Sequence, residues 1–307
     1  MDATTAFTDK RARKSTAIKW SLIVQWILLV CLATPLAVMI GLAPVVGQPL
    51  YNSMLFHPQK YQAGDYANPT LNGTTPIDVQ FKSDSGARLQ GFLYRLPDAK
   101  RIILLSHGNG GDVRDIKRLA AMLLRTGNSV FAYDYEGYGL SEGEPSLEGI
   151  CRDGSAAYQY LITQEHYAPN QIILFGESLG TLVTGKLAGS VNCAGVILEC
   201  PLYSIHRIGC DVVSYLDNYP DWAWTAEARQ LDNSVSLKKS HAPLLLIAGT
   251  ADQITPVTYA DDLYALAPSP KQFIRIDGAG HGDRLMRTSP DYKRGLEQFL
   301  KDLDRRS

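Results

Sequence analysis

Residues 176–180 read Gly-Glu-Ser-Leu-Gly and join two apolar segments of different character. The segment before them, 171–175, predicts a short buried strand, and the segment after them, 181–187, predicts a helix. A Gly-x-Ser-x-Gly sequence at such a junction is typical of a tight turn that exposes the serine hydroxyl at the edge of a sheet. Glycines are needed there because the two backbones pass too close for side chains. Ser178 is therefore a candidate nucleophile.

A serine hydroxyl becomes a useful nucleophile only when a base removes its proton and a third group orients that base. The histidines after Ser178 are His206, His241 and His281. His206 lies in an irregular segment, and His241 directly precedes a predicted strand. His281 lies in a glycine-rich loop after the apolar segment 272–276, at the carboxyl end of a strand, where open α/β sheets build their sites. We therefore expect His281 to be the base.

The orienting acid should also follow a strand, and Asp252 does so in the sequence Gly-Thr-Ala-Asp. Glu199 ends another predicted strand and is the alternative. Asp277 and Asp283 flank His281, but solvated loop carboxylates explain both equally well. A single loop of glycine with aspartate or histidine is more often only a turn. The joint occurrence of three polar groups, in order and each just beyond an apolar strand, favours Asp252 as the acid.

A fourth polar element follows the apolar segment 101–106, where residues 107–111 read His-Gly-Asn-Gly-Gly. Attack of a serine on an acyl carbonyl places negative charge on the carbonyl oxygen, which two backbone N–H groups must stabilise. One donor in such sites belongs to the residue after the nucleophile, here Leu179, and the other to a glycine-rich loop, here Asn109. We expect His107 to hold this loop, since it precedes the serine in the chain.

Together these segments resemble the α/β-hydrolases over residues 76–304, and in particular a branch of small membrane-anchored serine hydrolases. That branch is related to prolyl-oligopeptidase-like enzymes and to abhydrolase-domain depalmitoylases. The most branch-specific stretch is 134–143, Asp-Tyr-Glu-Gly-Tyr-Gly-Leu-Ser-Glu-Gly. Glu136 departs from the basic residue expected there, which affects the local charge. The stretch either forms a wall of the acyl pocket or is a tight loop whose tyrosines pack under the serine turn.

The resemblance implies a site with three catalytic residues and two oxyanion donors. The catalytic residues are Ser178, Asp252 and His281, and the oxyanion donors are Asn109 and Leu179. It also implies hydrolysis of an acyl ester or thioester, on a small or lipid-like substrate, through an acyl-enzyme intermediate. A serine peptidase of prolyl-oligopeptidase-like type is one alternative. A non-catalytic membrane-anchored binding module is another, since a fold does not guarantee a function.

The resemblance implies the α/β-hydrolase fold, and the rhythm of the sequence from residue 76 onward agrees with an α/β architecture. Apolar strands alternate with the amphipathic stretches 112–126, 146–164 and 290–303, which indicates a mostly parallel sheet with helices on both faces. Residues 76–307 show no linker and are expected to form one catalytic domain. The segment at about 201–240 lacks a strand pattern and interrupts the sheet between the sixth and seventh strands, where the resemblance implies a short cap.

Two further features concern this domain. Trp222 and Trp224 in the cap either line a substrate entrance, touch lipid, or pack within the cap. The pairs Thr255-Pro256 and Ser289-Pro290 predict helix starts, because a capping hydroxyl followed by proline is typical of a first helical turn.

The amino-terminal part predicts a membrane anchor. Residues 1–19 carry five basic and two acidic side chains, and residues 21–43 carry no charge. Such a length can cross a hydrocarbon core of ~30 Å. Because basic residues stay in the cytoplasm, we expect a cytoplasmic tail at 1–19, a signal anchor at 20–43 and a spacer at 44–75. The single-pass protein would then hold its catalytic domain on the non-cytoplasmic side, periplasmic or extracellular. A cleaved signal peptide is the alternative, although its apolar core is usually shorter.

Composition excludes several other functions. The net charge of −1 and the lack of a basic patch argue against binding to nucleic acid. No phosphate-binding or dinucleotide-binding glycine motif is present, and no His/Cys spacing resembles a metal site, so no cofactor and no metal are expected. Of the five cysteines, Cys200 could pair with Cys193 or Cys210 in an exported domain, but the set is not a disulfide framework.

Overall fold

The protein is described by a computed structural model over residues 3–60, 70–112 and 116–306, with only the backbone described for residues 3–21 and 111. The chain divides into two compact units, Met1–Pro49 and Leu50–Ser307. Each unit has its own organisation and is treated separately below.

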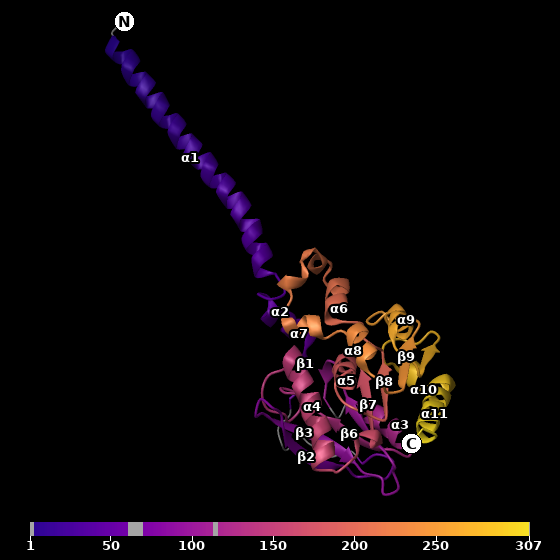
Figure 1. Ribbon diagram of the computed structural model, residues 1–307. Coiled ribbons are helices and arrows are strands. Elements are labelled where there is room, and N and C mark those ends of the chain that lie inside the picture. The colour runs from indigo at the N-terminus through magenta and orange to yellow at the C-terminus, as the bar shows by residue number, and fades with distance from the viewer. Residues whose placement is uncertain (1–2, 61–69, 113–115, 307) are drawn as a thin grey trace. The chain divides into compact units, whose positions relative to one another are not determined.

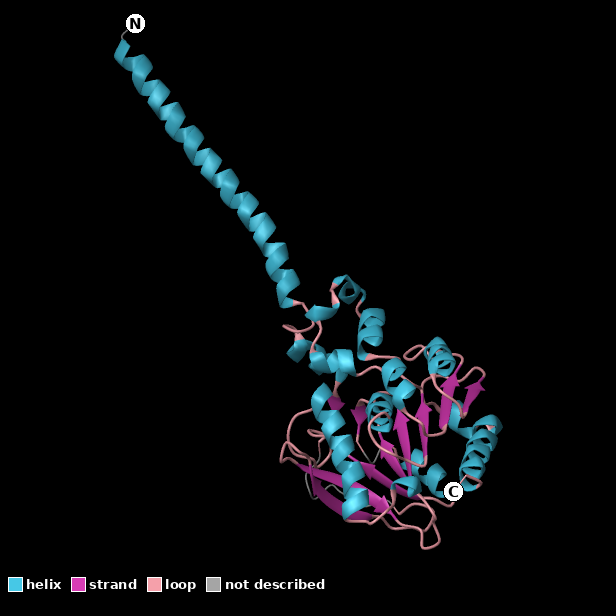
Figure 2. Ribbon diagram, in the orientation of Figure 1, coloured by secondary structure: helices cyan, strands magenta, loops and turns pink. Residues whose placement is uncertain are grey.

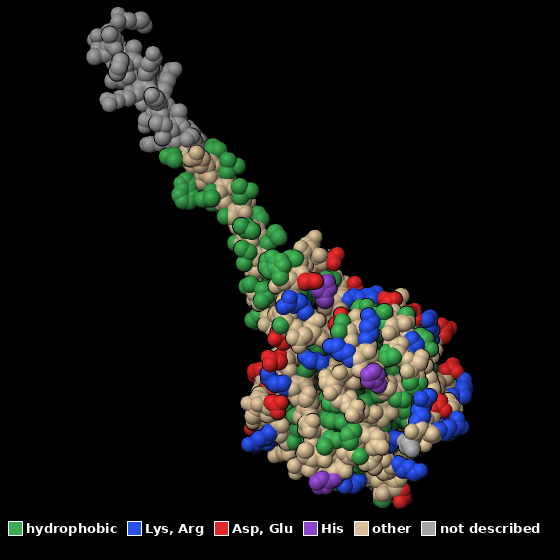
Figure 3. All heavy atoms as spheres, in the orientation of Figure 1, with side chains coloured by type: hydrophobic (Ala, Val, Ile, Leu, Met, Phe, Trp, Pro, Cys, Tyr) green, Lys and Arg blue, Asp and Glu red, His purple; other side chains and the backbone are tan. Residues whose placement is uncertain are grey.

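The first unit is dominated by one long helix, α1 (Ala3–Gly41), with Pro35 inside it. Its segment Leu22–Gly41 is long and apolar enough to cross a membrane. The side chains of this segment are exposed, and hydrophobic ones cover it in Figure 3. A signal sequence near the N-terminus can meet the same criteria of length and composition.

The second unit is built on an eight-stranded sheet with the strand order β10-β9-β8-β7-β4-β6-β3-β2 (Figures 1 and 2). The antiparallel pairings are β2 with β3 and β3 with β6, and all other neighbours are parallel. This confirms the predicted mostly parallel sheet. The strands are β2 (Ile77–Lys82), β3 (Arg88–Tyr94), β4 (Ile102–Ser106), β6 (Ser129–Tyr133), β7 (Ile172–Glu177), β8 (Gly195–Glu199), β9 (Leu244–Gly249) and β10 (Lys271–Ile276).

Helices cover both faces of this sheet, as the pattern predicts. Central strands are apolar on both sides, so alternate residues of one strand enter two different cores: Leu104 joins one cluster, and Ile103 and Leu105 join the other. The first cluster packs under α4 (Leu147–Thr163), α5 (Gly180–Ala188), α8 (Asn233–Lys239) and α9 (Val257–Leu266). The second packs under α3 (Lys117–Leu124), α10 (Arg284–Thr288) and α11 (Pro290–Asp304).

The predicted cap is present between β8 and β9, the sixth and seventh strands of the large sheet. It consists of short helices: α6 (Ile205–Val212), η2 (Ser214–Asn218), η3 (Asp221–Ala223), α7 (Ala226–Gln230) and α8. Hydroxyl and carboxyl side chains begin three of them, with Ser204, Thr225 and Asp232 each accepting a bond from a first-turn N–H. Trp224 is buried and stacks on His206 at 4.5 Å, whereas Trp222 is exposed.

Helix starts follow the sequence signals in one of two places. Ser289 caps α11 and Pro290 is its first residue, as predicted. The helix after Asp252 starts one residue later than the Thr-Pro signal indicates, at Val257, with Pro256 flanking it. The Thr255 hydroxyl does not cap this helix because it donates to Asp252 Oδ2 at 2.8 Å. The residue expected to cap this helix therefore supports Asp252.

The predicted spacer contains ordered structure. Helix α2 (Gln48–Leu55) is followed by β1 (His57–Pro58), which pairs in parallel with β5 (Gly110–Gly111). The compact second unit begins at Leu50, so these elements belong with the sheet. The remaining short helix is η1 (Pro169–Gln171). Residues 61–69 of the spacer, and 113–115 of the first predicted amphipathic stretch, lie outside the described residues.

Candidate active site

Ser178 lies at the carboxyl end of β7, in the tight turn that leads into α5. Its backbone has φ +52°, a left-handed conformation that costs a non-glycine residue on the order of 1 kcal/mol or more. Its N–H donates to the carbonyl of Glu199 at 2.9 Å, which ties the turn to the neighbouring strand. The turn needs its glycines, since a Cβ on Gly180 would lie 2.1 Å from the Ser106 carbonyl oxygen.

Two further loops bring His281 and Asp252 to this serine. Asp252 follows β9 and His281 follows β10, and these parallel strands end at the same edge of the sheet as β7. His281 Nε2 lies 2.9 Å from Ser178 Oγ, and His281 Nδ1 lies 2.8 Å from Asp252 Oδ2. The three residues that the sequence singles out therefore form one hydrogen-bonded chain, in an arrangement that can remove a proton from the serine.

The surroundings of Asp252 keep it ionised. Its Oδ1 accepts the N–H groups of Ile254 and Thr255, both at 2.9 Å, and its Oδ2 accepts the Thr255 hydroxyl. Burial alone would raise the pKa of Asp252, but the hydrogen bonds from His281 and Thr255 outweigh burial and lower it. An ionised Asp252 can hold the His281 Nδ1–H and stabilise an imidazolium. The supporting hydroxyl of Thr255 has no motif of its own, and the sequence did not indicate it.

The alternative carboxylates are engaged elsewhere. Glu199 accepts bonds from Arg287 and Tyr292, and Glu177 accepts a bond from Arg287. Asp283 caps α10, accepting the N–H of Met286 and that of Gly280. Asp277 accepts the Thr250 hydroxyl at 3.0 Å. None of these four hydrogen bonds to His281 in the described part of the chain.

The two expected oxyanion donors lie on loops next to Ser178. Leu179 directly follows the serine, and Gly108 runs close beside it, since a Cβ built there would lie 3.4 Å from Ser178 Cβ. Within the described residues, neither the Leu179 N–H nor the Asn109 N–H has a hydrogen-bond partner. Unpaired N–H groups beside a nucleophile are what stabilisation of a developing oxyanion requires.

The loop that carries Asn109 is held by hydrogen bonds to two other segments. Tyr135 donates its hydroxyl to the His107 carbonyl at 2.9 Å, and Tyr138 donates to the Asn109 carbonyl at 2.7 Å. The Asn109 amide side chain donates to the carbonyl of Leu55, the last residue of α2, at 2.9 Å. Both tyrosines are fully buried, which favours the interpretation of 134–143 as a tight supporting loop.

His107 is also fully buried and supports the same loop. Burial lowers its pKa to about 4, so the ring is neutral at neutral pH. Its Nδ1 lies 2.8 Å from the Gly108 carbonyl oxygen, a geometry in which Nδ1–H donates. His107 therefore holds the glycine-rich loop, as expected, and within the described residues it makes no hydrogen bond to Ser178 Oγ.

Removing the Tyr138 hydroxyl should weaken the loop that carries Asn109. We expect Tyr138→Phe to lower the free energy of unfolding by about 1 kcal/mol, the usual net worth of one hydrogen bond. Turnover should fall on the order of tenfold, because a displaced N–H binds the developing charge less well. Steady-state kinetics and denaturant unfolding measure the two effects.

Tyr158→Phe is the matched control. Tyr158 is also buried and donates to a backbone carbonyl, that of Asn192, at 2.7 Å, in a part of the fold remote from Ser178. It should lose similar stability and keep full turnover. Equal turnover in both variants would show that the Tyr138 bond has no part in the site.

A buried carboxylate supports the other side of the 134–143 loop. Asp153 on α4 accepts the Glu136 N–H at 2.8 Å and the Ser83 hydroxyl at 2.7 Å. Burial raises the pKa of Asp153 to about 7. Glu136 accepts the Ser85 hydroxyl at 2.5 Å and lies 3.7 Å from Arg152, so nearby donors accommodate its acidic side chain.

The raised pKa of Asp153 predicts a pH-dependent stability. Asp153 holds its proton more tightly in the folded state than in the unfolded state. The contribution of Asp153 to the free energy of unfolding is therefore full below about pH 4 and is lost as the pH rises to about 7. In Asp153→Asn this loss should vanish. Chemical denaturation at several pH values measures it. Asp84→Asn, an exposed control, should follow the wild type, and an unchanged slope in Asp153→Asn would contradict the assignment.

Metal ligation does not explain the site. Cys200 Sγ, a carboxylate oxygen of Asp252 and a ring nitrogen of His281 lie within 4.8 Å of one another. Protein hydrogen bonds already account for all three, since Sγ accepts the Gly282 N–H at 3.2 Å. Burial raises the pKa of the Cys200 thiol, which keeps it neutral. We assign no metal to these residues, and all five cysteines are free thiols.

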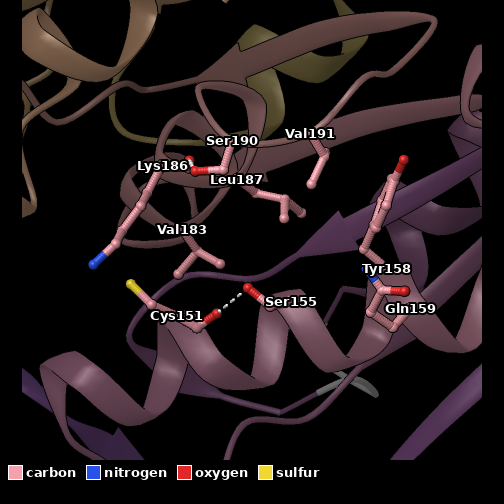
Figure 4. Close-up of a pocket in the computed structure, with 9 residues that line it drawn as sticks. All are labelled: Cys151, Ser155, Tyr158, Gln159, Val183, Lys186, Leu187, Ser190 and Val191. Atoms are coloured by element: carbon pink, nitrogen blue, oxygen red, sulfur yellow. Dashed lines mark hydrogen bonds between the residues drawn. The ribbon is translucent and has the colours of Figure 1, made fainter. Parts of the chain in front are cut away.

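A pocket of about 190 Å³ lies away from these residues, between α4 and α5 (Figure 4). Cys151, Ser155 and Tyr158 line it from α4, and Val183 and Lys186 line it from α5. It is smaller than a typical site for a small-molecule ligand. None of its lining residues belongs to the Ser178 cluster, so it does not form the substrate site.

Comparison with known proteins identifies the family. A family model described as "Serine aminopeptidase, S33" matches residues 97–226. An uncharacterised protein of Mycobacterium tuberculosis is 35% identical over 223 residues, which cover 70% of this chain and 76% of that protein. The chain belongs to the α/β-hydrolase superfamily. The family model also supports a hydrolase, in agreement with the resemblance seen in the sequence.

Other relatives agree with this assignment. The mouse protein named alpha/beta hydrolase domain-containing protein 17C is 32% identical over 68% of this chain. This chain spans 62% of the mouse protein and 60% of its human counterpart. A solved Pyrococcus furiosus esterase superposes with a TM-score of 0.64 over 81% of this chain and 98% of its own. Its identity is 18%, so it supports the fold alone.

Proposed function

We propose that this α/β-hydrolase is a membrane-anchored serine hydrolase that cleaves acyl esters or thioesters through a covalent acyl-enzyme. The observation that carries the proposal is the continuous hydrogen-bonded chain from Ser178 Oγ through the two nitrogens of His281 to Asp252. A nucleophile, a base and an orienting acid at these distances are what acyl transfer requires.

In the acylation half of the reaction, His281 Nε2 takes the proton of Ser178 Oγ as the oxygen attacks the acyl carbonyl. Asp252 holds the Nδ1–H of the resulting imidazolium. The N–H groups of Asn109 and Leu179 receive the negative charge that develops on the carbonyl oxygen. The tetrahedral intermediate then expels the alkoxide or thiolate, which takes the proton from Nε2, and the acyl group remains on Ser178.

Deacylation repeats the same steps with water. His281 Nε2 removes a proton from a water molecule, whose oxygen attacks the acyl carbonyl. The same two N–H groups hold the second oxyanion, and collapse returns the proton to Ser178 Oγ and releases the acid. Every step uses side chains and backbone groups of this chain, with water as the second substrate.

A fluorophosphonate probe tests the nucleophile. The wild-type protein should be labelled at Ser178, and Ser178→Ala should lose both labelling and turnover of a short aryl ester while keeping the fold, as judged by circular dichroism. Ser190→Ala, an exposed serine on another surface, should remain fully labelled. A folded wild type that neither reacts with the probe nor cleaves an ester would favour the binding module.

The family model that matches residues 97–226, serine aminopeptidase, gives a second candidate function, an aminopeptidase. Such an enzyme needs a carboxylate free to pair with the substrate's α-ammonium. Glu177 and Glu199, the carboxylates just behind Ser178, are already bound by Arg287. This favours acyl esters. On the same preparation, aryl esters of graded chain length should be cleaved well and aminoacyl arylamides poorly; the reverse ranking would favour the peptidase.

We further propose that Leu22–Gly41 anchors the protein, with residues 1–19 in the cytoplasm and the catalytic domain on the non-cytoplasmic side. The basic tail and the apolar helix support this orientation. Protease added to spheroplasts or sealed cells should digest the catalytic domain without lysis. Digestion only after lysis would reverse the orientation, and release of the domain by carbonate washing would indicate cleavage of the segment.

A further inference from the structure

Arg287 lies on α10, six residues after His281, and its guanidinium bonds two carboxylates at once. Nε and Nη2 donate to Glu199 Oε1 at 2.9 and 2.7 Å, and Nη2 also donates to Glu177 Oε1. The Glu199 side chain is fully buried, and its second oxygen accepts the Tyr292 hydroxyl. Few groups other than a planar guanidinium can satisfy two separated carboxylates in this way.

Each of these contacts connects to the proposed site. Glu177 directly precedes Ser178, and the Glu199 carbonyl accepts the Ser178 N–H. Gly282, the neighbour of His281, packs against the same ions, since a Cβ there would lie 3.0 Å from Glu177 Oε1 and 3.2 Å from Arg287 Nη2. The nucleophile turn, the end of β8 and the histidine loop therefore meet around one cation.

We propose that Arg287 is a positioning residue of the hydrolase, which holds the nucleophile turn and the histidine loop together and sets the charge beside His281. The inference rests on the proposed catalytic role of Ser178, Asp252 and His281. It assigns a function to Glu177, which occupies the first of the two unspecified positions in the Gly-x-Ser-x-Gly turn.

The charges of this cluster predict the direction in which each substitution changes the protonation of His281. Two carboxylates and one guanidinium leave the cluster with a net charge of −1. Burial raises the pKa of Glu177 and Arg287 opposes this rise, and the two carboxylates raise the pKa of Arg287 although burial would lower it. Arg287→Met takes the net charge to −2, which favours a protonated His281. Glu177→Gln takes the net charge to 0, which favours a neutral His281.

The other groups around His281 stay constant in these variants. Asp252 and Asp283 both have lowered pKa values and remain anionic. Burial raises the pKa values of the Cys200 thiol and of Tyr292, so both remain neutral. Thr255 and Ser178 contribute hydroxyls. Among these described groups, the variants therefore change only the charges of Glu177 and Arg287.

The experiment measures kcat/KM against pH for the full chain with a soluble aryl ester. The acidic limb, where the base must lose its proton, should move to higher pH in Arg287→Met and to lower pH in Glu177→Gln, each by on the order of half a pH unit. The double variant should return the limb to the wild-type position. Arg287→Lys keeps the charge and loses the planar fork, so kcat should fall with the limb unmoved.

Arg275→Met, which breaks the exposed pair with Asp261, is the control and should change neither kcat nor the limb. The inference is overturned if the acidic limb of the pH profile stays in place, or if it moves in the same direction in Arg287→Met and Glu177→Gln. Arg287 would then have only a structural role. If Arg287→Met fails to fold, Glu177→Gln keeps the Arg287–Glu199 bonds and decides the outcome alone. Failure of the proposed function is separate, since it would show as loss of probe labelling at Ser178 in the wild type.

Discussion

The close approach of two backbones at the end of β7 is the constraint on which the site depends. Ser178 takes a left-handed conformation there, and Gly180 leaves no room for a Cβ against the Ser106 carbonyl. The strain of the turn is balanced by its fixed surroundings, including the bond from the Ser178 N–H to Glu199. The serine oxygen is thereby held at hydrogen-bond distance from His281, on a loop that begins about a hundred residues later in the chain.

Support for this turn comes from polar groups that are buried and satisfied. Tyr135 and Tyr138 hold the glycine-rich loop on one side, and Arg287 with its two glutamates holds the histidine loop on the other. Buried polar groups of this kind are costly when unpaired and rigid when paired, which is why they can fix loops that carry few apolar contacts. The parallel sheet supplies the common edge, and these bonds supply the final positions.

The sequence predicted the sheet, the cap and the residues brought together at Ser178, because each signal is local: an apolar strand followed by a polar loop. It did not predict several side-chain partners that depend on the packing of the loops. Thr255 looked like a helix cap and instead donates to Asp252. Leu55, in the segment expected to be a spacer, accepts the Asn109 side chain. Glu177 pairs with Arg287, and that pairing depends on packing that no periodicity reveals.

The central claim is that Ser178 carries the acyl group during turnover, and trapping that intermediate tests it most directly. The wild-type protein is mixed with an excess of an activated aryl ester, quenched in acid within the first turnovers, digested and mapped by mass spectrometry. We expect one acyl adduct, on the peptide that contains Ser178, which disappears as the ester is consumed. An adduct that forms and disappears on a residue other than Ser178 would contradict this role of Ser178. So would ester cleavage with no adduct at any quench time, in a protein whose deacylation has been slowed.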